Sequence, residues 1–123
     1  MDLVWQEKYN TDIPEMDNQH QTLFKIMEKL NDDDSKDDKG LLKELYKYAI
    51  YHYKSEVELL NANSYPNIEN LIAFYQESLD QLFIDIGMYM AGCLFKEDVL
   101  YSLERWFLKH TTILKNEFIK YVL

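Results

Sequence analysis

Four side chains of this sequence could bind a metal ion or share a proton. They are the three histidines of the chain and one glutamate: His20, His52, Glu56 and His110. His52 and Glu56 are four residues apart, so on a helix they lie one turn apart on the same face. Imidazole and carboxylate groups bind iron, zinc and manganese, and the same groups also transfer protons. The question is therefore whether the three histidines meet Glu56 at one point inside the fold.

Four amphipathic segments must position these side chains. Their apolar residues recur at intervals of three and four, which predicts helices over residues 17–31, 41–61, 68–90 and 96–122. Short polar connections separate the segments. They favour an all-α fold, an up-down-up-down antiparallel four-helix bundle, in one domain covering residues 1–123. Residues 1–16 lack helical periodicity, and we expect an extended arm that packs across the bundle through Trp5 and Tyr9.

The predicted helices bring the candidate residues to similar levels of the bundle. His20 lies near the start of the first helix and His110 midway along the fourth, while His52 and Glu56 lie on the buried face of the second. Tyr75, in the first half of the third helix, is predicted to face them. A buried carboxylate without a partner is costly, so we expect Glu56 to have a partner in the core.

Composition excludes several classes of function. The net charge of −9 disfavours binding to nucleic acid and to anionic membranes. A single cysteine, Cys93, cannot form an internal disulfide and is typical of a reducing compartment. The start of the chain has no signal-peptide pattern, and no apolar run is long enough to span a bilayer. We therefore expect a cytoplasmic protein. The acidic stretch before Gly40 lacks the ligand order of an EF-hand calcium loop and is predicted to be a solvated turn.

Several segments, spread over essentially the whole chain, resemble the hemerythrin family, whose members are four-helix bundles. The N-terminal arm matches at Trp5, Tyr9, Thr11 and Ile13. The segment Asp17-Asn18-Gln19-His20-Gln21-Thr22-Leu23-Phe24 resembles the family's D-x-Q-H-x-x-L-F signature, and His52-Tyr53-Lys54-Ser55-Glu56 resembles its H-F-x-x-E segment. Tyr65-Pro66 matches the start of the family's third helix, and Trp106-Phe107-Leu108-Lys109-His110 resembles its W-L-x-x-H segment.

The resemblance implies roles for these residues. In the family the corresponding histidines bind iron and the glutamate bridges two irons, which implies iron ligation by His20, His52 and His110 and a bridging role for Glu56. The chain departs from the family pattern elsewhere. Leu71 and Tyr75 stand where the family has two further ligand histidines, and Lys115 replaces a bridging aspartate. The resemblance thus implies a depleted site that keeps the ligands of one iron, with Tyr75 as a substitute ligand for the other.

Three functions follow as alternatives. In the first, the chain binds one or two metal ions, iron before zinc or manganese, and takes a small diatomic ligand such as dioxygen. In the second, no metal binds, and Lys115 supplies the positive charge that pairs with Glu56 in a structural or regulatory bundle. In the third, an open metal position beside Tyr75 activates oxygen or peroxide, although no motif of an enzyme accompanies it.

Overall fold

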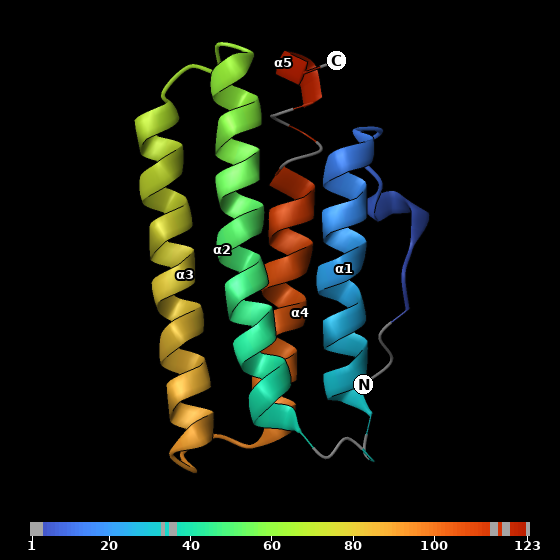
Figure 1. The fold of residues 1–123 in the computed structure, drawn as a ribbon, viewed down its shortest axis with the longest axis vertical. Coiled ribbons are helices and arrows are strands. Elements are labelled where there is room, and N and C mark those ends of the chain that lie inside the picture. Colours follow the sequence, from blue (N-terminus) through green and yellow to red (C-terminus); the bar gives the residue numbers. More distant parts are fainter. Residues whose placement is uncertain (1–3, 33, 35–36, 114–115, 117–118, 123) are drawn as a thin grey trace.

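The computed structural model describes residues 4–32, 34, 37–113, 116 and 119–122. Its described helices are η1 (Glu7–Tyr9), α1 (Pro14–Asn31), α2 (Asp38–Ala62), α3 (Ile68–Met90), α4 (Lys96–Ile113) and α5 (Ile119–Val122). Figure 1 shows the four long helices side by side, with successive helices running in opposite directions. The prediction of an all-α antiparallel four-helix bundle is therefore confirmed.

The predicted helix boundaries are right for α3 and need correction elsewhere. α1 begins at Pro14, three residues before the predicted start, because proline has no N–H and suits the first turn of a helix. α2 begins at Asp38 rather than at residue 41, because the side chain of Asp37 accepts a hydrogen bond from the Gly40 N–H at 3.2 Å. The continuous helix predicted over 96–122 is described as α4 and the short α5, and residues 114, 115, 117 and 118 between them lie outside the described residues.

Two left-handed residues stop helices so that the chain can reverse. Gly92 follows α3 with φ of 81°, and the N–H of Cys93 donates to the Met88 carbonyl at 2.8 Å. Ser64 follows α2 with φ of 58°, and the N–H of Tyr65 donates to the Leu60 carbonyl at 3.0 Å. Both are the Schellman arrangement, which satisfies carbonyls at a helix end. After α3 the residue with positive φ is a glycine, and after α2 it is a serine.

The N-terminal arm packs on the bundle, as predicted. Figure 1 shows it running beside α1. The Trp5 ring lies edge-on to Tyr9 at 5.2 Å and to Phe24 of α1 at 5.6 Å, and Tyr9 lies edge-on to Phe107 of α4 at 5.5 Å. The buried Thr11 donates its hydroxyl to Asp17 at 2.8 Å. The arm therefore covers the seam between α1 and α4. None of the described helices has the length and apolar composition needed to cross a membrane.

Candidate metal centre

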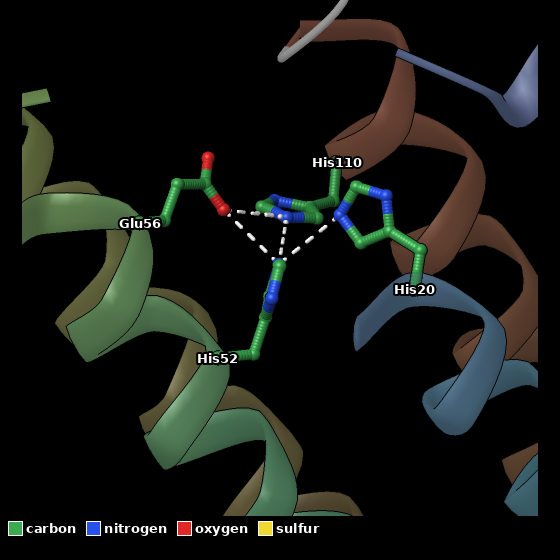
Figure 2. A group of neighbouring side chains, drawn as sticks. All are labelled: His20, His52, Glu56 and His110. Atoms are coloured by element: carbon green, nitrogen blue, oxygen red, sulfur yellow. Dashed lines mark hydrogen bonds and ion pairs between the residues drawn. The ribbon is translucent and has the colours of Figure 1, made fainter. Parts of the chain in front are cut away.

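The helices bring the four candidate residues to one level in the core. α2 and α4 run in the same direction, and His52 and His110 each lie fourteen residues beyond the first residue of their helix. At 1.5 Å per residue, each histidine lies about 21 Å from the start of its helix. Glu56 lies one turn beyond His52 on α2. His20 comes from α1, which runs in the opposite direction to α2 and α4. Figure 2 shows the four side chains pointing toward one another from three helices.

His52 is the centre of this cluster. Its Nε2 atom lies 3.1 Å from Nε2 of His20, 2.8 Å from Nε2 of His110 and 3.0 Å from Oε2 of Glu56. Oε2 of Glu56 is also 3.0 Å from Nε2 of His110. All four residues are buried, and one potential ligand atom from each lies within 4.8 Å of the others. The structure thus brings together all the histidines and the glutamate that the sequence singled out.

A glutamine that the sequence reasoning missed orients His52. The side chain of Gln19 is buried, and its Oε1 atom lies 2.8 Å from Nδ1 of His52. A carbonyl oxygen only accepts hydrogen bonds, so Nδ1 carries the proton and donates it. The Nε2 lone pair of a neutral His52 then faces the cluster. This is the tautomer that a metal requires, and a hydrogen bond to the other ring nitrogen is the usual way to fix it.

Burial sets the charge state of the cluster. It lowers the pKa of His20 well below the usual 6.5, with further lowering by His52 and His110. It also lowers the pKa of His52, although Glu56 partly opposes this effect. Burial alone would raise the pKa of Glu56, but the adjacent His110 outweighs it and holds that pKa below its usual range. At neutral pH the site therefore presents an ionised carboxylate together with neutral His20 and His52, the protonation states of metal ligands.

Hydrogen bonds alone do not account for this packing. The single lone pair of a neutral His52 Nε2 can accept one proton, yet three polar atoms surround it. One of them is the carboxylate oxygen Oε2 of Glu56, which is itself an acceptor. Among the described residues, that oxygen is buried without a hydrogen bond of acceptable geometry. Two acceptors held 3.0 Å apart in a medium of low polarity repel each other, and a cation between them removes the repulsion.

The distances suit a metal ion. Two neighbouring ligands of an octahedral ion, each bonded at about 2.1 Å, lie about 3.0 Å apart, close to the 2.8–3.1 Å separations around His52 Nε2. Three imidazoles and one carboxylate form a donor set for divalent iron, zinc or manganese. The residues present therefore fit a metal ion.

Tyr75 reaches the cluster through Glu56. Its hydroxyl donates a hydrogen bond to Oε1 of Glu56, so Glu56 has the core partner that the sequence led us to expect. Burial and the nearby Glu56 raise the pKa of Tyr75, which favours the neutral phenol as a donor. Its predicted role as a metal ligand stays a prediction. The other predicted partner, Lys115, lies outside the described residues.

Behind Tyr75 lies an aromatic wall. Tyr53 is buried and its ring stacks on that of Tyr75, with centroids 4.1 Å apart and planes 9° apart. Trp106 donates its indole N–H to the Tyr53 hydroxyl at 2.7 Å and stacks beside His110 at 6.1 Å. Burial raises the pKa of Tyr53. These rings pack around His110 on the α3 and α4 side of the cluster.

Comparison with known proteins supports the fold. No protein-family model matches the chain, and no curated protein matches it. The solved crystal structure of a leucine-to-phenylalanine mutant of another protein is similar, with a TM-score of 0.76 and 19% sequence identity over 96% of this chain and 92% of that chain. At that identity the likeness shows the fold alone. Fold and site together define a four-helix-bundle protein with a buried cluster of three histidines and a glutamate that could hold a metal ion.

Proposed function

We propose that this chain is a hemerythrin-like non-haem metal protein that holds one iron ion through His20, His52, Glu56 and His110. The observation that carries the proposal is the convergence of His20 Nε2, His110 Nε2 and Glu56 Oε2 on Nε2 of His52, which Gln19 holds in the metal-binding tautomer. The sequence resemblance supports iron, because each of these residues stands at a ligand position of the hemerythrin pattern. Bound ferrous iron would supply a redox-active centre with affinity for a small ligand such as dioxygen.

One ion is proposed rather than two because the ligands of a second ion are depleted. Leu71, at the position of one family histidine, is buried and cannot bind a metal. Tyr75, at the other position, donates its hydroxyl to Glu56. Both oxygens of Glu56 are therefore committed, one to the cluster and one to Tyr75. Binding of two irons with dioxygen shared between them, as the family pattern implies, is not part of the proposal.

Elemental analysis of the protein tests the proposal. Protein purified without added metal or chelator should carry about one metal ion per chain, and anaerobic titration of metal-free protein should give tighter binding of iron(II) than of manganese(II). His52→Ala should abolish binding, because His52 is the residue closest to the other three. Tyr51→Ala, a change of the exposed neighbour on the same helix, is the matched control and should bind as the original chain does.

Two outcomes would contradict the proposal. Two ions per chain would show that Tyr75 or another group completes a second site. A well-folded protein that binds no iron, zinc or manganese would favour the metal-free bundle. That alternative has one observation in its support, since Tyr75 already gives the buried carboxylate a donor. It further predicts that Lys115→Ala destabilises the protein while His52→Ala does not. The metal-site proposal predicts that Lys115→Ala leaves metal binding intact.

A further inference from the structure

A groove of about 560 Å³ runs along the α3–α4 interface and ends at the cluster. Its lining extends on α3 from Phe74 to Asp85, about 16 Å at 1.5 Å per residue. At its deep end are Tyr53 and His110, both almost fully buried. The volume is in the range of small-molecule sites in proteins. Neither the metal ligation nor the packing described above uses this space.

The walls of the groove are apolar along most of its length. Leu82 and Phe74 line it from α3, and Val99, Leu103 and Trp106 line it from α4. Between the charged residues of the rim, uncharged polar groups come from Ser78, Ser102 and Gln81. An elongated apolar channel with a few polar groups suits an extended hydrocarbon body rather than a hydrated ion.

The charges on the rim are unevenly placed. Arg105 and Lys109 line the groove from successive turns of α4, toward the end that reaches His110. The Lys109 ammonium crosses the groove and lies 5.5 Å from the centre of the Phe74 ring on α3. Among the described residues neither cation forms an ion pair. The one acidic residue of the lining, Asp85, lies near the far end and accepts a hydrogen bond from Gln81 at 3.0 Å.

We propose that the α3–α4 groove binds an aliphatic carboxylic acid of medium chain length. The carboxylate pairs with Lys109 and Arg105, and the hydrocarbon chain lies along Leu82, Leu103 and Val99 toward Asp85. The polarity of the groove sets this direction, because the reverse orientation would bring the carboxylate to Asp85. The net charge of −9 repels anions at long range, so selection for a carboxylate must come from these two local cations. Binding requires no metal ion.

Calorimetric titration of the full chain, freed of metal by chelator and dialysis, tests this site. Octanoate should bind at least about tenfold more tightly than octanol or octylammonium. The double variant Arg105→Glu/Lys109→Glu should lose about tenfold or more of the octanoate affinity. Lys43→Glu/Lys47→Glu makes the same change of charge at two exposed lysines of α2 outside the groove, and it should leave the affinity nearly unchanged.

A blocking variant locates the ligand. Ser102 is an exposed residue that lines the groove, so Ser102→Trp should fill the channel and abolish octanoate binding while circular dichroism stays helical. Equal affinity for octanoate and octanol would overturn the carboxylate assignment. Unchanged octanoate binding in Ser102→Trp, or an equal loss in the α2 control variant, would overturn the site. Because metal-free protein is used, these results are independent of whether the cluster binds iron.

Discussion

At the scale of single residues, the tautomer of His52 decides what the cluster can do. With Nδ1–H donated to Gln19, the lone pair of Nε2 faces His20, His110 and Glu56. His20 has no comparable support, since its Nδ1 atom is buried without a hydrogen-bond partner among the described residues. The orientation of the ligands thus depends heavily on one amide side chain from α1.

Replacement of Gln19 tests this role. Gln19→Leu leaves the His52 Nδ1–H buried without an acceptor, so we expect the free energy of unfolding to fall by about 1–3 kcal/mol. Metal affinity should fall by about 10- to 100-fold, as for other partners of metal-binding histidines. Nitrogen NMR of His52 in metal-free protein should report loss of the Nδ1–H tautomer. Gln19→Glu keeps an acceptor oxygen and should retain affinity, and Gln76→Leu, at an exposed glutamine of α3, is the control. Unchanged affinity and tautomer in Gln19→Leu would contradict the role.

The site residues were predictable where the sequence placed rare residue types on a buried face. The three histidines and Glu56 lay on such faces and do meet in the core. Gln19 was missed because a glutamine in a helix is usually exposed. Its one signal was its position next to His20 in the D-x-Q-H segment. The contact of Tyr75 with Glu56 and the stacking of Tyr53 depend on how α3 packs on α2, which sequence spacing does not specify.

At the scale of helices, the number and direction of the elements followed from apolar periodicity, while their ends depended on local chemistry. The predicted start of α1 was three residues too late, because the helix begins at Pro14, which suits the first turn. The predicted start of α2 was three residues too late, because Asp37, within the stretch predicted to be a turn, caps the helix. The chain reverses after α2 at Ser64, which has a positive φ. A serine in the sequence does not indicate this conformation.

Ser64 offers a test of this helix end. The left-handed conformation costs an L-residue about 1–2 kcal/mol and costs glycine little. Ser64→Gly should therefore raise the free energy of unfolding by about 0.5–1 kcal/mol, after the greater entropy loss of glycine is deducted. Urea denaturation measures the change. Ser55→Gly, in the interior of α2, is the matched control and should destabilise the protein by about 0.5 kcal/mol. A destabilised Ser64→Gly variant would contradict the capping geometry.

At the scale of the whole molecule, the buried cluster should make the stability of the metal-free protein depend on pH. The pKa of His20 and that of His52 are both below 6.5 in the folded state. Between those values and 6.5 the unfolded chain binds more protons, so acid favours unfolding. Each such histidine should lower the free energy of unfolding by up to about 1.4 kcal/mol per pH unit below 6.5, with little effect above it.

Denaturant titrations of metal-free protein at pH values from 8 to 5 measure this dependence. The stability contributed by the neutral histidines should be complete above pH 6.5 and decline below it. His20→Leu removes one of the two groups and should give a shallower decline. Bound metal should make the decline steeper, because protons compete with the metal for the same nitrogens. Equal stability of the metal-free protein at pH 8 and pH 5 would contradict the charge state assigned to the cluster.

The distribution of the cluster over the helices has a consequence for how the molecule opens. His20, His52 and His110 are separated by 32 and 58 residues and belong to α1, α2 and α4, whereas α3 supplies only the hydroxyl of Tyr75. An ion at the site would act as a cross-link, so none of those three helices could detach without breaking a coordinate bond. α3 carries no such restraint and borders the groove. Amide hydrogen exchange in the metal-bound protein would thus be slowed in α1, α2 and α4 and stay faster in α3.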